Sequence, residues 1–315
     1  MDSVDLQKLA QHTRFMREAG FALLFASLLL ALFLFIPLGP RTITSAPTAV
    51  ATSTTPNAFA HIIIDAQAAI VYDLSTGETL YAKNADAQLP LASLTKLLTV
   101  YAALLELSPS TPITISAQAT RVDAPRAFRV GQTFSLTDLA RLTLTASLND
   151  GAAAIIETTA ARQNRTQNEA LASAAAALDL SQTYAINGSG LDMSTMVSGG
   201  YGSAFDLARL AGALVEKAPD IAAATTQSSA EAVSEGGTSF SVKNTDPFVD
   251  TIPRLLLSKT GYTDLAGGNL VLVFDAGMGH PIAVVVLDSS AKARFTDGTT
   301  LIAATLAHFA GVASL

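Results

Sequence analysis

The hydrophobic and polar positions after residue 60 change their period along the chain, and strand-like segments lie at both ends of this region. Residues 68–74 and 78–83 are short runs rich in β-branched and aromatic side chains. Ser75-Thr76-Gly77 separates them, which is typical of a β-hairpin. Near the other end, three more runs have strand character: residues 254–259, 269–274 and 282–287. We therefore predict two early strands and three late ones.

Between these strands the apolar residues recur at helical spacing. Ser93 stands at the start of a periodic run that continues through Leu107, and serine is a common helix cap. Further helices are predicted at residues 135–146, 152–161, 170–178 and 204–215, and a last one at 292–310. This order of elements predicts an α+β fold in which an antiparallel sheet packs against helices.

A long apolar run precedes this region. Residues 19–39 carry no charge, and about 20 helical residues are enough to cross the hydrocarbon core of a bilayer. Lys8, Arg14 and Arg17 precede the run and only Arg41 follows closely, which favours a cytoplasmic N-terminus. We predict a cytoplasmic tail at 1–18 and a single transmembrane signal anchor at 19–39. The alternative is a cleaved signal peptide and a secreted chain.

Residues 40–60 are dominated by Thr, Ser, Ala and Pro, which predicts a flexible linker, and residues 61–315 are predicted to form one domain. Half of the chain is apolar, so a large buried core can form. The net charge of -7 without a basic run argues against nucleic acid as a partner. The absence of cysteine excludes thiolate metal sites, and none of the four histidines has a metal-ligand spacing. We predict no metal and no cofactor.

Three short polar motifs occur in a fixed order. Ser93 and Lys96 form a Ser-x-x-Lys motif, Ser147 and Asn149 form a Ser-x-Asn motif, and Lys259-Thr260-Gly261 is the third, at residues 259–261. This set occurs in serine enzymes that react with penicillin. A second Ser-x-x-Lys at 289–292 follows the other motifs and breaks the order, so we interpret it as a helix cap and a solvated lysine.

The chemistry of the first motif depends on its geometry. On a helix, Ser93 and Lys96 lie on one face, about 5–6 Å apart at Cβ. A serine hydroxyl needs a base to become a nucleophile. A lysine amine can serve as that base only if burial or a nearby positive charge, such as Lys259, lowers its pKa. The alternative is that Ser93 only caps the helix and Lys96 is solvated.

The other two motifs suit the remaining tasks of an acyl transfer. Ser147 and Asn149 precede Asp150-Gly151, a turn signal, so that the Ser147 hydroxyl can relay a proton and the Asn149 amide can hold a substrate carbonyl or steady Lys96. The alternative is a polar turn in which Asn149 caps the next helix.

Lys259 and Thr260 follow an apolar strand at its predicted end and suit a carboxylate. Gly261, lacking a Cβ, leaves room for a ligand backbone. The alternative is an ordinary strand that leads into a loop.

The chain resembles the D-alanyl-D-alanine carboxypeptidases, which are low-molecular-mass penicillin-binding proteins. Besides the three motifs, the resemblance rests on the segments 69–81, 84–86, 90–96, 149–152, 187–191, 203–208 and 260–264. It implies a penicillin-binding-protein/β-lactamase-like transpeptidase fold with a five-stranded antiparallel sheet, and a D,D-peptidase catalytic domain at 61–315. It also implies a cell-wall enzyme outside the bacterial membrane whose substrate is the peptidoglycan pentapeptide.

The resemblance also implies residue roles. Ser93 would form an acyl-enzyme with Lys96 as its base, and Ser147 would relay the proton to the departing D-alanine. The substrate-binding residues would be Asn149, Lys259, Thr260 and Gly261. The backbone N–H groups of Ser93 and Tyr262 would form the oxyanion hole. β-Lactams would acylate Ser93.

The sequence departs from the family pattern at two places. Leu148 replaces a residue that is often small, which could narrow the cleft. The sequence also ends after the closing helix, so the C-terminal domain of many relatives is not expected and the N-terminal segment would supply membrane attachment.

Three alternatives to the carboxypeptidase stay open. They are a D,D-endopeptidase that cleaves crosslinks, a serine β-lactamase that would use Glu157 or Glu169, and a catalytically silent cell-wall-binding protein.

Overall fold

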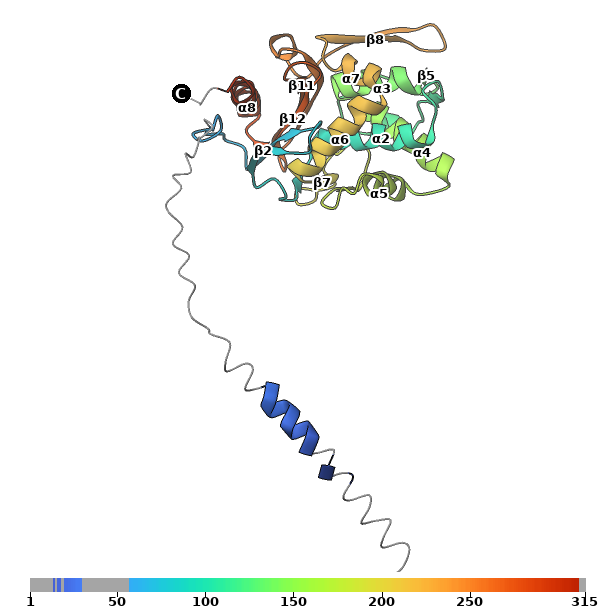
Figure 1. The fold of residues 1–315 in the computed structure, drawn as a ribbon. Coiled ribbons are helices and arrows are strands. Elements are labelled where there is room, and N and C mark those ends of the chain that lie inside the picture. The colour runs from blue at the N-terminus through green and yellow to red at the C-terminus, as the bar shows by residue number, and fades with distance from the viewer. Residues whose placement is uncertain (1–13, 15, 18–19, 30–56, 312–315) are drawn as a thin grey trace, which may run out of the picture. The chain divides into compact units, whose positions relative to one another are not determined.

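The computed structural model describes residue 14, residues 16–17, residues 20–29 and residues 57–311 (Figure 1). Thr54–Leu315 form one compact unit, and every element named below lies in it. Most of the predicted tail (1–18) and linker (40–60), and residues 19 and 30–39 of the predicted anchor, lie outside the described residues. Residues 20–29 are helical. Among the described residues, no helix combines the length and the apolar character that crossing a bilayer requires.

Five antiparallel strands form the main sheet, as predicted. Their spatial order is β10-β11-β12-β1-β2, with bounds Leu255–Thr263, Gly267–Asp275, Pro281–Ser289, Ala68–Asp73 and Thr79–Lys83. The pairing of β1 with β12 joins the first and last strands of the domain, with Val71 opposite Val284. Both the early hairpin and the three late strands are therefore confirmed.

The end predicted for the first late strand is wrong. We expected this strand to stop at Lys259, but β10 continues to Thr263 because it stays paired with β11 to the end, where Thr263 lies opposite Gly267. The Lys-Thr-Gly motif consequently lies inside a strand at the edge of the sheet, where one side of the backbone has no neighbouring strand.

The two faces of the sheet pack into two separate hydrophobic cores. Ile70 and Val285 point into the larger core, which the helices α2 to α7 cover. Their neighbours Val71 and Val284 point to the opposite face and into the smaller core beneath α8. Figure 1 shows the sheet between α8 on one side and α2 to α7 on the other. Burial on both faces explains why these strands are apolar runs without polar alternation.

All predicted helices after residue 60 are present, with small differences in their ends. The helices α2 to α8 are Thr95–Glu106, Leu136–Ala146, Asn149–Gln163, Gln167–Ala177, Ala204–Lys217, Pro219–Ala224 and Ala293–Phe309. Ser135 caps α3 by accepting the N–H of Asp138. α7 was not predicted, because its six residues are too few to show a helical period.

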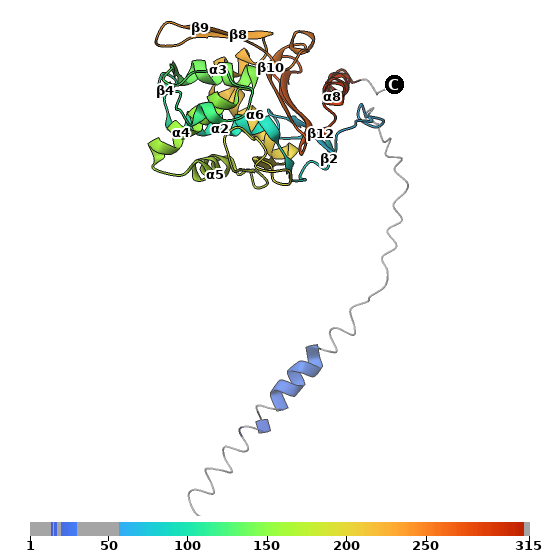
Figure 2. The same cartoon turned by 180° about the vertical axis from the view of Figure 1, so that it is seen from behind.

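The sequence analysis also missed the short strands and turns. The strands β3 to β9 are Leu89–Pro90, Pro112–Thr114, Thr133–Ser135, Tyr184–Ala185, Gly200–Gly202, Ser229–Val233 and Ser239–Lys243. The 3₁₀ turns are Ala92–Leu94, Ala119–Arg121 and Val249–Thr251. β8 and β9 form a hairpin that extends along the helical region (Figure 2). Phe240 attaches it by packing against Phe128 and Phe134 at centroid distances of 5.5 and 5.1 Å.

Asp297 provides a test of how the start of the domain is held. Its buried carboxylate accepts the N–H groups of Asp65 and Ala66 and the hydroxyl of Ser289. We expect Asp297→Asn to lower the free energy of unfolding by about 1–3 kcal/mol, because at least one buried donor loses its acceptor. Urea unfolding measures the change, and Asp86→Asn, at an exposed position, is the control. Equal stability of the two variants would contradict this role.

Candidate active site

Ser93 lies in a tight turn and does not cap a helix. The turn Ala92–Leu94 precedes α2, whose N-cap is Leu94, and no side chain caps either element. Ala92 has a φ of +48°, which side chains other than glycine rarely adopt. Within residues 91–96 only Ser93 is partly exposed. The helix-cap alternative for Ser93 is therefore wrong, and its hydroxyl is the one group of this turn that is presented to solvent.

Two glycines make room for the turn. A Cβ at Gly190, where φ is +76°, would lie 1.9 Å from the carbonyl oxygen of Ala92. A Cβ at Gly261 would lie 2.9 Å from the carbonyl oxygen of Leu91 and 3.3 Å from the nitrogen of Ser93. Gly261 was expected to leave room for a ligand. The space beside it is instead filled by the backbone that carries Ser93.

Lys96 is buried beside this hydroxyl. Its Nζ lies 2.8 Å from Ser93 Oγ and donates to the carbonyl oxygen of Ser189 at 2.7 Å. Burial, with a smaller contribution from the charge of Lys259, holds the pKa of Lys96 well below its usual range, against the opposing effect of Asp150. The solvated alternative for Lys96 is therefore wrong. A neutral amine at 2.8 Å can accept the proton of Ser93.

Ser147 is held in an unusual backbone conformation next to Lys259. It follows α3 with a φ of +58°, a left-handed conformation that turns the chain before α4. Lys259 Nζ donates to Ser147 Oγ at 2.9 Å. Burial, and then the charge of Arg294, lowers the pKa of Lys259 to about 7. The Ser147 oxygen is thus engaged as an acceptor, and its own proton remains available to another group.

Asn149 occupies a different position from the one expected. Its side-chain nitrogen donates to the carbonyl oxygens of Asp123 and Ala124 at 2.9 and 3.0 Å. It therefore neither caps α4, which it begins, nor has an N–H left for a substrate carbonyl. Its buried Oδ1 has no hydrogen-bond partner among the described residues. Asn149 can therefore offer a ligand only its side-chain oxygen, which is a hydrogen-bond acceptor.

Asp150 and Leu148 complete this part of the site. Asp150 was expected to form part of a turn. It is instead buried in the first turn of α4, where its Oδ2 accepts the N–H groups of Ala127 and Phe128. It thereby fixes the segment that Asn149 contacts. Leu148 is buried in the larger core.

Two cations meet at the Lys-Thr-Gly strand: the buried Lys259 on β10 and the partly buried Arg294 on α8. Thr260 Oγ1 lies 2.6 Å from Thr245 Oγ1. Arg294, near the start of α8, donates to the carbonyl oxygen of Gly261 at 2.6 Å, and its Nε has no partner among the described residues. Sequence reasoning missed Arg294 because no motif surrounds it and only the packing of α8 brings it to the strand. Lys259 and Arg294 together favour an anion here.

The two predicted oxyanion donors come from segments that touch. Tyr262 follows Gly261 on the edge strand β10, and Gly261 packs against the backbone of Ser93. The side chain of Tyr262 is half exposed. The structure therefore brings all eight predicted site residues into two neighbouring walls. One consists of the Ser93 turn and the Ser147 loop, and the other of β10.

The glutamates named for the β-lactamase alternative, and the second Ser-x-x-Lys, do not contact Ser93 or Lys96 by hydrogen bonds among the described residues. Glu169 forms a capping box with Thr166 at the start of α5. Glu157 accepts the hydroxyl of Ser116 at 2.6 Å. In the part of the chain that the structure describes, neither glutamate hydrogen-bonds to Ser93 or Lys96. In the second Ser-x-x-Lys, Lys292 is exposed, as expected.

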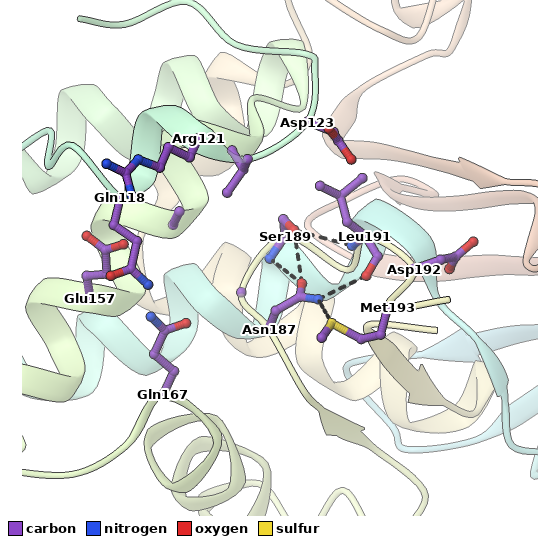
Figure 3. A pocket seen from close by; sticks show the side chains of 13 residues that line it. Gln118, Arg121, Asp123, Glu157, Gln167, Asn187, Ser189, Leu191, Asp192 and Met193 are labelled. Carbon is purple, nitrogen blue, oxygen red and sulfur yellow. Dashed lines mark hydrogen bonds between the residues drawn. The ribbon is translucent and has the colours of Figure 1, made fainter. Parts of the chain in front are cut away.

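A cavity of about 310 Å³ adjoins the Lys96 side of the site (Figure 3). Ser189, whose carbonyl accepts from Lys96, and Asp123, whose carbonyl accepts from Asn149, both line it. No residue of β10 is part of its lining. The cavity therefore lies away from the two cations.

Comparisons with known proteins agree with this geometry. The family model for D-alanyl-D-alanine carboxypeptidases matches residues 51–291. The chain belongs to the D-alanyl-D-alanine carboxypeptidase family. A D-alanyl-D-alanine endopeptidase of Pseudomonas aeruginosa is 30% identical over 238 residues, which cover 74% of each chain.

Two further relatives differ in how much of their length is matched. The D-alanyl-D-alanine carboxypeptidase DacD of Salmonella typhimurium is 30% identical over 243 residues, which cover 73% of this chain and 60% of that protein. The chain thus spans less than two thirds of that relative. Penicillin-binding protein D2 of Listeria monocytogenes, solved in an ampicillin-bound form, superposes with a TM-score of 0.66 at 27% identity, over 78% of this chain and 98% of the other. The expected penicillin-binding-protein fold is confirmed.

Gly190→Ala tests whether close packing positions Ser93. The added methyl group meets the carbonyl of Ala92, so the turn must move. Because a shift of about 1 Å in a reacting group can cost about 10²-fold in rate, we expect acylation by a labelled penicillin to slow by about that factor. Gly236→Ala is the matched control, because its Cβ would meet only one atom, at 4.0 Å. An unchanged acylation rate in Gly190→Ala would contradict the argument.

The lowered pKa of the buried Lys259 predicts how protein stability depends on pH. In the folded chain we expect the Lys259 side chain to titrate near pH 7 instead of its ordinary 10.5. The folded state then binds fewer protons than the unfolded state between these pH values. The contribution of Lys259 to stability therefore rises with pH across this window and is least favourable below pH 7.

NMR titration of the lysine Cε resonances measures the pKa of Lys259 in the folded chain. The variant Lys259→Arg assigns the resonance, and the urea-unfolded chain is the control. In the unfolded chain, Lys259 should titrate near the ordinary lysine value of 10.5. A folded-state midpoint near 10 for Lys259 would contradict the prediction.

Proposed function

We propose that this chain is a serine-type D-Ala-D-Ala carboxypeptidase that removes the terminal D-alanine from peptidoglycan stem peptides through a Ser93 acyl-enzyme. One observation carries the proposal: the partly exposed Ser93 hydroxyl lies 2.8 Å from the buried amine of Lys96, whose pKa is lowered. A nucleophile in contact with a neutral base is the arrangement that acyl transfer requires. Membership in the carboxypeptidase family agrees with it.

In the first step Ser93 Oγ attacks the carbonyl carbon between the two D-alanines, and its proton passes to Lys96 Nζ. Negative charge develops on the carbonyl oxygen. The backbone N–H groups of Ser93 and Tyr262 would accommodate it. A donor of this kind contributes about 3–4 kcal/mol to the stability of the transition state.

In the second step the carbon–nitrogen bond breaks. Ser147 donates its hydroxyl proton to the departing nitrogen, and Lys259, which donates to Ser147 Oγ, restores that proton. A pKa of about 7 suits this role because Lys259 can then both give and regain a proton near neutral pH. Lys96 then releases to solvent the proton it took from Ser93, and Lys259 regains one from solvent. The neutral Lys96 deprotonates the water that attacks the Ser93 ester, and it returns that proton to Ser93 Oγ as the ester bond breaks. The products are the shortened peptide and free D-alanine.

Substrate orientation follows from the charges. The terminal carboxylate of the peptide would lie at Lys259, Thr260 and Arg294, because these groups form the cationic side of the site. The Oδ1 of Asn149 would accept an N–H of the peptide backbone. β-Lactams carry a comparable carboxylate beside a reactive amide, and we expect them to acylate Ser93.

The endopeptidase alternative remains a second candidate, because a relative of 30% identity is a D-alanyl-D-alanine endopeptidase. The same residues would cleave the bond between D-alanine and a crosslinked neighbour. The two activities differ only in the size of the leaving group.

We further propose that the chain is attached to the bacterial cell membrane by one pass, with the domain outside the cytoplasm. The uncharged run at 19–39 and the basic residues before it support this proposal. A cleaved signal peptide and secretion is the alternative. Alkaline extraction of membranes, followed by mass measurement of the mature N-terminus, separates the two.

The carboxypeptidase proposal is tested by incubating the chain with a muramyl pentapeptide. We expect free D-alanine from the wild type and a loss of at least about 10³-fold in Ser93→Ala, because the residual rate depends on binding and the oxyanion hole alone. Ser290→Ala, in the second Ser-x-x-Lys region, is the control. Retained D-alanine release in Ser93→Ala, or failure of labelled penicillin to acylate the wild type, would refute the mechanism.

A further inference from the structure

An apolar groove lies beside the cationic side of the active site. It has a volume of about 440 Å³ and runs between the segment before the turn Val249–Thr251 and the first turns of α8. Its lining residues are Pro247, Phe248, Lys292, Phe295, Thr296 and Thr299. The rings of Phe248 and Phe295 pack with their centroids 5.2 Å apart, and Phe248 is 42% exposed. The groove is thus apolar along its aromatic wall and has one ammonium group at its rim.

Both walls of the groove are connected to the Lys-Thr-Gly strand. On one side, Thr245, two residues before Pro247, contacts Thr260 through its hydroxyl at 2.6 Å. On the other side, Arg294 donates to the carbonyl of Gly261, and its guanidinium stacks over the ring of Phe295 at 4.7 Å. The groove therefore begins within one or two residues of the groups that would hold the carboxylate of the departing residue.

The size of the groove exceeds what a departing D-alanine needs. The side chain of D-alanine is a single methyl group and would leave most of the volume empty. In a crosslinked peptide the departing amine belongs to a longer aliphatic side chain instead. Methylene groups of such a chain can pack against Phe248 and Phe295 and leave water. Lys292 can then pair with a carboxylate at the far end of the chain.

We propose that this groove is a leaving-group subsite. It binds the side chain of the residue after the cleaved bond when that side chain is a long aliphatic chain ending in a carboxylate, so that the enzyme accepts leaving groups larger than D-alanine. The proposal rests on the acyl-enzyme function proposed above. The reaction is the same hydrolysis: the bond between the D-alanine carbonyl and the departing nitrogen breaks, and water supplies OH to the carbonyl and H to the nitrogen.

The test uses three peptides that differ only in the last residue: D-alanine, D-norleucine and D-2-aminopimelate. With the full-length wild-type chain we expect kcat/KM to be at least about tenfold higher for the aminopimelate peptide than for the alanine peptide, since even one methylene in an apolar pocket is worth about tenfold or more. Norleucine, which lacks the terminal carboxylate, should fall between them.

Variants then locate the preference. Phe248→Ala should lower the ratio of aminopimelate to alanine kcat/KM by about tenfold, and Lys292→Gln should lower the aminopimelate value alone. Phe309→Ala and Lys217→Gln are the controls, because Phe309 is 43% exposed at the other end of α8 and Lys217 is exposed on α6. Thr299→Phe, which fills the groove without removing an aromatic ring, should lower the ratio as Phe248→Ala does.

The outcomes separate this inference from the function on which it rests. A wild-type ratio near one, or ratios that Phe248→Ala and Thr299→Phe leave unchanged, overturns the subsite even though D-alanine release and penicillin acylation persist. Failure of labelled penicillin to acylate the wild-type chain overturns the proposed function and the subsite together. Thermal unfolding of each variant confirms that a changed ratio does not come from a misfolded fraction.

Discussion

The active site depends on the burial of two lysine amines, Lys96 and Lys259, in one small volume. A buried ammonium loses its hydration, so the pKa values of both lysines fall. The charge of Lys259 lowers the pKa of Lys96 further, and the charge of Arg294 lowers that of Lys259. The protein has to compensate for this burial with hydrogen bonds, which Ser93, Ser147 and the carbonyl of Ser189 provide. Burial thus favours the neutral amine of Lys96 beside Ser93 and places the pKa of Lys259, beside Ser147, at about 7, without a histidine among these residues. Destabilisation of the charged forms is thus the source of the chemistry.

The second requirement is a close approach between the turn that carries Ser93 and the edge strand β10. Gly261 lets the strand lie against the backbone of Ser93, and Gly190 lets the loop that carries Ser189 lie against Ala92. Direct backbone packing therefore holds Ser93 against β10 and against the loop whose Ser189 carbonyl binds Lys96. Because β10 is the last strand of the sheet, its outer edge stays available for a peptide. Rigid support of this kind keeps reacting atoms at productive distances.

Much of the fold could be predicted from the sequence, because its longer elements bury a face and show the corresponding period. The strands around Val71 and Val284 and the helices on both sides were found in this way. The two- and three-residue strands, the 3₁₀ turns and the six-residue α7 are too short to show a period, whereas the alternation of β8 and β9 was overlooked. The end of β10 was misjudged because polar residues at 258–260 resemble a strand end. They continue the strand only because β11 pairs with them.

The order of the three motifs alone determined the chemistry: a serine, a lysine base, a second serine and a cationic strand. The chemical reactivity of each of these side chains follows from its residue type, whatever its position in the fold. Only the tertiary structure decided which atoms of these residues are available. It directs the Asn149 nitrogen to two backbone carbonyls, fills the space beside Gly261 and brings Arg294 of α8 to the carbonyl of Gly261. Hydrogen-bond partners and free volume depend on segments far apart in the chain, and for that reason no local pattern could contain them.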